Sequence, residues 1–286
     1  MSAFFSYLLN GVSVGCGFAL VASGLIIIFR VTRVVNLAQG LFAVVGGFTA
    51  SSLLGGGMPH GFAELSAIAV AAAAGLLTGV VAIAKRGTRP EASLLVTLGV
   101  GIFGYAIEIL IWGDQPRSFS GFEGVFRLGD LDLPKQYVLV IAVTLAVFGL
   151  LEFFFERTFL GKALSACASN RYAAGLIGIG VLRMGLLAFT LGGALGGVAG
   201  VLLTPLRPIS YDSDVLLFVN GFAAAILAGL RRPLLALGGG LLLGVAEAMV
   251  AGYAKASYQS SFALLLTLAI LVVQAARRPA LHVAES

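Results

Sequence analysis

The stretch ERTFLGKALSACASNRYAAGLIGIG, residues 156–180, decides the fold of this chain, and we call it the shelf. It is a basic segment of small residues between two apolar runs of membrane length. Residues 162–177 are rich in alanine and leucine and contain no proline, which favours one or two short helices ended by Gly178 and Gly180. We predict that the shelf is an ordered surface on one side of a membrane protein. An amphipathic helix that merely lies on the bilayer is the alternative.

The composition around the shelf excludes a water-soluble globule. Hydrophobic residues make up 59% of the 286 residues, charged residues make up 11%, and the mean hydropathy is +1.03. A soluble domain carries about 25% charged residues. Because roughly 20 residues are needed to cross the apolar core of a bilayer, membrane helices take up nearly the whole length. We therefore predict one transmembrane domain, residues 1–286, with no soluble enzymatic domain.

Windows of about 19 residues predict an all-α polytopic helical bundle of about nine transmembrane helices, within a range of eight to ten. The first apolar run has no basic residue before it and continues for membrane length, so we expect a span there and not a cleaved signal peptide. The second candidate is interrupted by polar residues and glycines, and the seventh is short. The candidates lie near 7–29, 34–54, 62–84, 92–112, 136–155, 181–203, 214–229, 233–252 and 260–276.

The distribution of basic residues predicts the orientation, because cytoplasmic loops are enriched in Lys and Arg. The longest loop on the opposite, periplasmic side is 113–135, and it offsets its three basic residues with four acidic ones. We therefore expect the N-terminus outside, the C-terminus inside and the shelf in the cytoplasm. Of the 18 basic residues, five lie outside (Arg117, Arg127, Lys135, Arg207, Lys255) and 13 inside (Arg30, Arg33, Lys85, Arg86, Arg89, Arg157, Lys162, Arg171, Arg183, Arg231, Arg232, Arg277, Arg278).

The glycines, cysteines and histidines add structural expectations but no catalytic site. Glycines four residues apart, such as Gly192, Gly196 and Gly200 or Gly240 and Gly244, predict close packing of helices in lipid. The basic residues are scattered over the connections, so no nucleic-acid partner is expected. No metal site, disulfide or nucleophile and base arrangement is indicated by the remaining candidates, Cys16, Cys167, His60 and His282.

The chain also lacks a phosphate-binding loop of the G-x-x-x-x-G-K-[ST] type, since Gly161-Lys162 continues into Ala163 and no glycine stands five residues earlier. If ATP drives this protein, a separate subunit must bind the ATP and Mg. We expect a chain that is not an enzyme and that binds no cofactor itself.

Two acidic residues, Glu108 and Glu247, fall within predicted spans, where a charge costs about 2.5–3.5 kcal/mol at the helix centre. One interpretation is that both are interfacial carboxylates near the outer ends of their helices, with a packing or snorkelling role. The other is that Thr97, Gly101, Tyr105 and Glu108 form one polar stripe that lines a translocation path.

Amide side chains at membrane depth allow two similar interpretations. Asn36 and Gln39 share one face of the predicted second span and are followed by Gly40. They either bond to neighbouring helices or mark a broken helix beside a substrate path. Asn220 in the seventh span has the same two interpretations.

Four runs in order along nearly the whole chain resemble the branched-chain amino acid ABC transporter permeases of the LivH type. Each run alone is apolar and rich in glycine, so the resemblance rests on all four together. They are SGLIIIFRVTRVVNLAQG (23–40), VTLGVGIFGYAIEILIWG (96–113), the shelf followed by VLRMGLLAFTLGGALGGVAGVLL (181–203), and NGFAAAILAGL (220–230) with GGGLLLGVAEAM (238–249).

The resemblance implies that the shelf is a variant of the coupling loop that docks on an ATP-binding subunit. Three positions depart from the family. Tyr172 stands where the family often has an acidic residue, and Gln39 and Leu41 stand where His and an acidic residue are common. The sequence LRRP (230–233) replaces a glycine-rich turn. The coupling positions carried over are Gly161, Lys162, Asn170, Arg171, Ala173, Ala174 and Gly178, with Tyr172 as the departure.

The implied protein is the permease subunit of an ATP-driven importer in a bacterial inner membrane. Its implied partners are a paralogous second permease, two ATP-binding cassette subunits, an extracytoplasmic solute-binding protein and membrane lipid. Branched-chain amino acids are the expected substrates, with urea, short amides or other amino acids as alternatives. An ion-coupled secondary transporter or channel is the competing class, for which paired intramembrane charges or two similar halves are expected.

Overall fold

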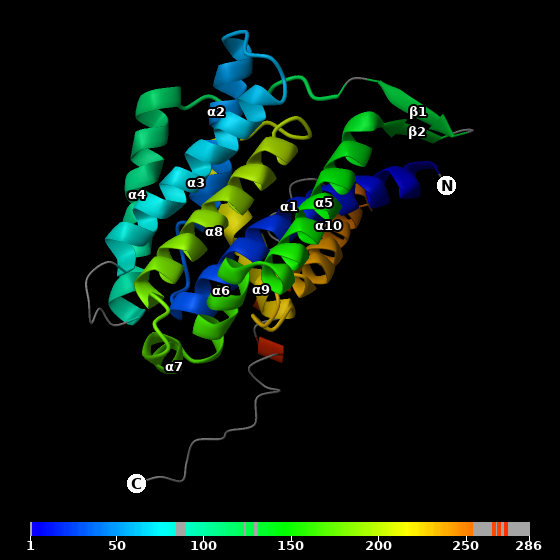
Figure 1. The fold of residues 1–286 in the computed structure, drawn as a ribbon. Helices are drawn as coiled ribbons and strands as arrows, with labels where there is room; N and C mark the ends of the chain where they lie inside the picture. The colour runs from blue at the N-terminus through cyan, green and yellow to red at the C-terminus, as the bar shows by residue number, and fades with distance from the viewer. Residues whose placement is uncertain are drawn as a thin grey trace.

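A computed structural model describes residues 2–83, 90–122, 124–128 and 131–253, and in addition 265, 266, 268, 269, 272 and 273. The described chain is a helical bundle with a small hairpin at one end and two short helices at the other (Figure 1). The predicted span 260–276 lies mostly outside the described residues.

Six helices are long and apolar enough to cross a membrane, judged by length and composition over the described residues. Two shorter apolar helices are α2 (Gln39–Gly55) and α9 (Ser213–Leu227), which correspond to the two predicted spans that were interrupted or short. The six are α1 (Ser2–Thr32), α3 (Phe62–Ile83), α4 (Pro90–Trp112), α5 (Lys135–Arg157), α8 (Val181–Leu203) and α10 (Leu235–Tyr253).

The shelf contains the two short helices α6 (Phe159–Ser169) and α7 (Arg171–Leu176), as predicted. Each begins at a side-chain cap, because Thr158 Oγ1 accepts from the Gly161 N–H and Asn170 Oδ1 accepts from the Ala173 N–H, both at 3.0 Å. Gly178 follows α7 with φ +85°, a left-handed conformation that favours glycine. The expected stop at Gly178 is thus confirmed.

The prediction of an all-α chain is wrong at the loop 113–135. Strands β1 (Val125–Leu128) and β2 (Leu131–Pro134) form an antiparallel hairpin there, with Val125 opposite Pro134. Strands of four residues are too short to give a clear apolar period, and the many charges of this segment favoured a loop. We call the end of the molecule that carries β1 and β2 the hairpin end, and the end that carries α6 and α7 the shelf end (Figure 1).

The core of the bundle forms where α1 packs against α8, α9 and α10. Glycines permit this packing, because a Cβ atom on Gly240 would lie 2.6 Å from the Ala19 nitrogen, and one on Gly244 would overlap the Gly11 carbonyl oxygen. On α8, a Cβ on Gly200 would overlap the Ala43 carbonyl oxygen of α2. The predicted role of these glycines in close helix packing is confirmed.

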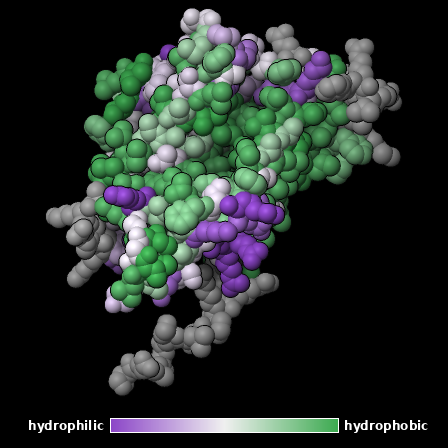
Figure 2. All heavy atoms as spheres, in the orientation of Figure 1, coloured by the Kyte–Doolittle hydropathy of each residue, from purple (hydrophilic) through white to green (hydrophobic). Residues whose placement is uncertain are grey.

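Apolar side chains cover much of the flank of the bundle between its two ends (Figure 2). The exposed large hydrophobic residues lie along α3, α4 and α5 in particular, among them Leu65, Leu77, Ile102, Leu110 and Leu150. An apolar surface that faces water would be unfavourable, so this flank suits a hydrocarbon environment.

Candidate functional site

The connection from α1 to α2 is a break in the middle of the bundle. Residues 33–38 are not helical, so the predicted span 34–54 begins five residues too early and Asn36 does not share a helix face with Gln39. The two side chains meet across a turn instead, where Asn36 Nδ2 donates to Gln39 Oε1 at 3.2 Å. Gln39 Nε2 donates to the Gly192 carbonyl oxygen of α8 at 2.8 Å. Both interpretations of these amides therefore hold in part, since the helix is broken and the amides bond to neighbours.

The start of α2 lies deep between the two ends of the bundle. Gly192, which Gln39 contacts, stands halfway along α8. A Cβ on Gly40 would overlap the carbonyl oxygen of Asp214, so the first turn of α2 packs directly against the first turn of α9. From this meeting point α2 runs toward the hairpin end and α9 toward the shelf end (Figure 1). Two helix N-termini thus meet within the bundle, an arrangement that transporters use beside substrate sites.

The polar stripe on α4 faces this meeting point. Thr97 Oγ1 accepts from the Leu37 N–H at 3.2 Å, and a Cβ on Gly101 would lie 3.8 Å from Ala38 Cα. One turn further, the rings of Tyr105 and Tyr211 make an edge contact with centroids 5.0 Å apart. The stripe therefore joins the break before α2 to the segment that leads into α9. Its role in lining a translocation path stays a prediction.

Glu108, the last residue of the stripe, is buried and has no hydrogen-bonding neighbour in the part of the chain that the structure describes. Its side chain is 1% exposed, and neither carboxylate oxygen has a hydrogen-bond partner within the described residues. Asp214, in the first turn of α9, follows three residues after Tyr211, which contacts Tyr105 of the same stripe. A snorkelling role for Glu108 is therefore wrong, whereas a packing role fits its burial.

The other two polar candidates lie elsewhere. Asn220 is fully buried on α9, next to Gly221, where an added Cβ would lie 2.4 Å from Val21 Cγ1 of α1. Glu247 is 1% exposed on α10, between Gly244 and Ala248, which both approach Gly11 of α1. A snorkelling role for Glu247 is therefore also wrong. Among the eight candidates for the translocation path, the structure brings together Asn36, Gln39, Gly40, Thr97 and Tyr105, and Glu108 lies about one turn beyond Tyr105 on α4.

Two arginines tie the shelf to the end of α1. Arg171 Nη1, at the start of α7, donates to the Thr32 carbonyl oxygen at 3.0 Å, and Arg33 Nη2 donates to the Ala168 carbonyl oxygen near the end of α6 at 3.2 Å. Both acceptors are at helix C-termini, where cations are favourable. Arg33 has φ 62°, which is uncommon for a residue other than glycine. These two hydrogen bonds, which we call the arginine clamp, join the shelf to the break before α2.

The coupling positions on the shelf divide into anchors and exposed residues. A Cβ on Gly161 would overlap the Phe154 carbonyl oxygen, and Ala174 is buried, so both hold the shelf against the bundle. Cys167 is also buried, and burial raises the pKa of its thiol. Lys162 and Ala173 are exposed. The exposed apolar side chains are Phe159 (82%), Tyr172 (78%), Leu176 (72%) and Ile177 (75%), which we call the shelf surface.

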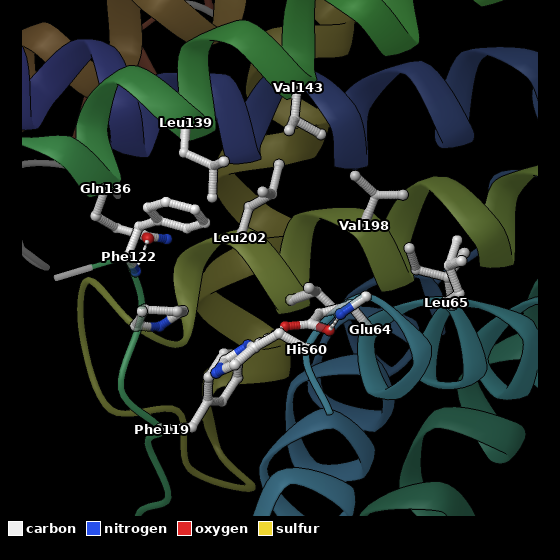
Figure 3. Close-up of a pocket in the computed structure, with 15 residues that line it drawn as sticks. His60, Glu64, Leu65, Phe119, Phe122, Gln136, Leu139, Val143, Val198 and Leu202 are labelled. Atoms are coloured by element: carbon white, nitrogen blue, oxygen red, sulfur yellow. Dashed lines mark hydrogen bonds and ion pairs between the residues drawn. The ribbon is translucent and has the colours of Figure 1, made fainter. Parts of the chain in front are cut away.

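A second candidate site is an apolar cavity of about 630 Å³ at the hairpin end, between α3, α5 and α8 (Figure 3). Leu139 and Val143 point into it from α5, and Val198 and Leu202 from α8. Its polar groups lie at the edges. His60 Nδ1 and Glu64 Oε1 are 2.7 Å apart, and Gln136 Oε1 accepts from the Phe122 N–H at 2.9 Å. The cavity suits an apolar ligand or side chain and offers no arrangement for covalent chemistry.

Sequence patterns indicated only part of these sites. The charge pattern identifies Arg33 of the arginine clamp only as an indicator of membrane orientation. A basic residue that directly follows a helix is also a sign that its side chain bonds to carbonyl groups at a helix end. The carboxylate of Asp214 could have been found from the acidic pair Asp212 and Asp214 at the start of a short apolar run. The apolar cavity joins helices distant in sequence, and we find no local signal for it.

Comparisons with known proteins are consistent with this architecture. The family model for the permease component of branched-chain amino acid transport systems matches residues 7–273. The high-affinity branched-chain amino acid transport system permease protein LivH of Salmonella typhimurium is 30% identical, with 94% of each chain covered. The probable branched-chain amino acid transport permease protein LivH of Methanocaldococcus jannaschii is 29% identical, with 85% of this chain and 80% of the relative covered.

More distant matches include a permease named for ribose import and a solved structure. The ribose import permease protein RbsC of Escherichia coli is 26% identical and covers 79% of this chain and 72% of the relative. The solved structure of PsaBC from Streptococcus pneumoniae in complex with Fab matches with a TM-score of 0.53 at 13% identity, covering 93% of this chain and 90% of that chain. This likeness concerns the fold alone. The extent of the family match and the similarity to the LivH permeases show that the chain belongs to the family of permease components of branched-chain amino acid transport systems.

Proposed function

We propose that this chain is the membrane-spanning permease subunit of an ATP-driven importer of branched-chain amino acids, in the inner (plasma) membrane of a bacterial cell. The observation that carries the proposal is the shelf surface. Four large apolar side chains are more than two-thirds exposed at the end of the bundle, on helices that are capped and clamped in place. An ordered apolar surface of this kind is typical of a site for protein contact.

The occupant we propose for the shelf surface is an ATP-binding cassette subunit, one for this chain and one for a paralogous second permease. The chain has no phosphate-binding loop, so ATP and Mg belong to the ATPase subunits. An extracytoplasmic solute-binding protein delivers the substrate at the hairpin end. The basic residues of the shelf end support this orientation, which places the shelf in the cytoplasm.

The arginine clamp supplies the path by which movement of the shelf reaches the membrane. When the ATPase subunits close, α6 and α7 shift, and Arg171 and Arg33 carry the shift to residues 32 and 33 at the end of α1. The next segment is the break before α2, where Leu37 bonds to Thr97 and Gln39 bonds to Gly192. Movement of the shelf thus changes contacts among α2, α4 and α8 directly. A break at this position can bend without loss of regular helix hydrogen bonds.

The substrate class rests on the relatives, whose names state branched-chain amino acid transport. A ribose permease among the more distant relatives makes a direct substrate test necessary.

The test is reconstitution into proteoliposomes with the ATPase, second permease and solute-binding subunits encoded in the same organism, followed by uptake of radiolabelled leucine. We expect uptake that requires ATP and all subunits. Leucine uptake by this chain alone, driven by an ion gradient, would contradict the proposal and favour a secondary transporter. ATP-driven uptake of urea or ribose without leucine would keep the importer and change its substrate.

The shelf surface is tested in the same system with the double variant Tyr172→Glu and Leu176→Glu. Because the carboxylates would be buried against the ATPase, we expect the ATPase subunits to lose binding in a pull-down and uptake to be lost. Met58→Glu is the matched control, since Met58 is exposed at the hairpin end. Full ATPase binding and uptake in the double variant would mean that the shelf is only a helix on the membrane surface.

The clamp is tested with Arg171→Ala, which leaves the shelf surface unchanged. We expect the ATPase subunits to bind and hydrolyse ATP while uptake per ATP falls, because the link to α1 is lost. Arg157→Ala is the control, an exposed basic residue at the start of the same shelf that is not one of the coupling positions. An unchanged ratio of uptake to ATP hydrolysis in Arg171→Ala would remove the clamp from the coupling mechanism.

A further inference from the structure

We propose that a cavity at the shelf end binds the headgroup of phosphatidylethanolamine. The phosphate group would lie on Arg30 and Arg232, and the ammonium group on Glu152 and Glu156. This inference goes beyond the proposed import function, because import does not by itself require a lipid site. It begins from four charged side chains that line one cavity without pairing to one another.

The cavity has a volume of about 250 Å³ and lies where α1, α5, α6 and the connection from α9 to α10 meet. Arg30 comes from the last turn of α1, and Arg232 from the connection. Glu152 and Glu156 stand one turn apart near the end of α5. Ser165 of α6 adds a half-buried hydroxyl group. Polar side chains from segments far apart in the sequence thus border one space.

The charges of the cavity balance in number but have no partners. Among the described residues, none makes an ion pair or a side-chain hydrogen bond with Arg30, Arg232, Glu152 or Glu156. Arg30 is half-buried, so its guanidinium group has lost part of its hydration, and a charge in this position needs a partner. A ligand with one negative and one positive group supplies partners to both kinds of side chain.

The backbone that carries Arg232 is fixed to the helix that carries Arg30. Ser23 Oγ of α1 donates to the Pro233 carbonyl oxygen at 3.2 Å, and Leu230 at the start of the connection has φ 55°, which is uncommon for a residue other than glycine. The two arginines therefore keep their relative placement. A pair of guanidinium groups held in this way suits a phosphate group, whose oxygens match the planar N–H donors of arginine.

The surroundings of the cavity favour a membrane lipid as the source of these groups. Its apolar wall includes Phe148, Leu151 and Leu234. Figure 2 shows hydrophilic side chains at the shelf end, directly beside the apolar flank, and the headgroup layer of a bilayer lies at such a boundary. A lipid with its headgroup in the cavity would keep its acyl chains along α5, where Leu150 and Phe153 are exposed.

The two kinds of charge distinguish among phospholipids. A primary ammonium has three N–H donors, which two carboxylates can accept. Phosphatidylglycerol has the phosphate but no ammonium, and the methylated ammonium of phosphatidylcholine has no N–H donor. A water molecule takes about 30 Å³ in the liquid, so the cavity admits a group of roughly eight non-hydrogen atoms, the size of an ethanolamine phosphate.

The experiment measures lipid binding to the full chain in detergent by native mass spectrometry. Phosphatidylethanolamine, phosphatidylglycerol and phosphatidylcholine with identical acyl chains are titrated separately, and Kd is obtained for the first bound lipid. We expect phosphatidylethanolamine to bind roughly tenfold more tightly than the other two, the effect of one hydrogen bond between charged groups. Equal affinity for phosphatidylethanolamine and phosphatidylglycerol would overturn the inference.

Two double variants assign the parts of the headgroup to their partners. Arg30→Gln with Arg232→Gln should weaken the binding of all three lipids roughly tenfold, because the phosphate is common to them. Glu152→Gln with Glu156→Gln should weaken only phosphatidylethanolamine, so that phosphatidylglycerol binds at least as tightly. A merely structural role of the glutamates would not change the order of the lipids.

Arg231→Gln and Glu91→Gln are the matched controls, since both side chains are exposed at the shelf end and neither lines the cavity. They should leave the three Kd values unchanged. Glu152 and Glu156 are also exposed, so their double variant should fold and give a result even where the arginine variant does not. The inference is overturned if the glutamate double variant keeps the preference for phosphatidylethanolamine, or if Arg231→Gln weakens binding as much as the arginine double variant.

Discussion

Helices α4 and α8 have the same length and nearly the same hydropathy, and yet their positions in the bundle are opposite. Both contain 23 residues, with mean hydropathy 2.2 and 2.0 in their most apolar windows. Within those windows 67% of α8 is buried inside the described protein, against 11% of α4. Hydropathy alone therefore does not separate a helix of the core from a helix of the surface in a membrane protein.

The difference lies in how each helix is attached. All six glycines of α8 are buried, and a Cβ on any of them would come closer than 3.0 Å to a neighbouring atom. On α4, Gly99 has open space around it and Gly101 has ordinary contacts, while a Cβ on Gly104 would meet only the flexible end of the Leu41 side chain, at 2.5 Å. The buried residues of α4 are polar instead, namely Ser93, Thr97 and Glu108. We infer that α8 is held by the fit of its backbone against its neighbours, and α4 by a few polar contacts.

The largest expected effect comes from adding a methyl group to each helix. Gly200→Ala in α8 would push a Cβ into the Ala43 carbonyl group, and we expect it to lower the free energy of unfolding by about 2 kcal/mol or more, despite the better helix propensity of alanine. Gly99→Ala in α4 creates no clash, so only the better helix propensity of alanine acts, and the free energy of unfolding should rise by up to about 1 kcal/mol. Unfolding of the purified chain by SDS in mixed micelles measures both. A loss of equal size in the two variants would contradict the comparison.

Sequence patterns predicted much of the fold because membrane helices are long and apolar. The span 181–203 coincides with α8, and the spacing of its glycines indicated close packing. The short helices of the shelf followed from alanine content and a terminal glycine. These features depend on local sequence, which is why they could be read from it.

The remaining features depend on contacts between segments far apart in the chain. Asn36 and Gln39 looked like neighbours on a helix, but the bond from Gln39 to Gly192 belongs to a backbone that is broken just before α2. The burial of Glu108 depends on segments distant in sequence that pack against α4, such as α2, whose Leu41 lies beside Gly104. The hairpin 125–134 was missed because strands of four residues give no clear period.

The next largest effect is expected from loss of a hydroxyl group, which should lower the stability more in α4 than in α8. Thr97→Val in α4 keeps the shape of the side chain but removes the acceptor for the Leu37 N–H, which lies in the break before α2. A buried donor left without a partner costs about 1–3 kcal/mol. We expect a loss of that size in the same SDS titration, together with faster hydrogen exchange at Leu37. Unchanged exchange at Leu37 would show that α4 is not held through this bond.

The smallest effect is expected from the matching change in α8. Thr190 Oγ1 donates at 3.0 Å to the Leu186 carbonyl oxygen of its own helix, so Thr190→Val removes no contact between helices. The carbonyl of Leu186 keeps the capacity for its regular helix bond, and the free energy of unfolding should change by about 0.5 kcal/mol or less. A helix held by shape tolerates the loss of a hydroxyl but not the gain of a methyl group, whereas a helix held by polar contacts shows the opposite pattern. A loss in Thr190→Val as large as in Thr97→Val would mean that hydroxyl groups stabilise both helices alike, and that glycine packing is not what distinguishes α8 from α4.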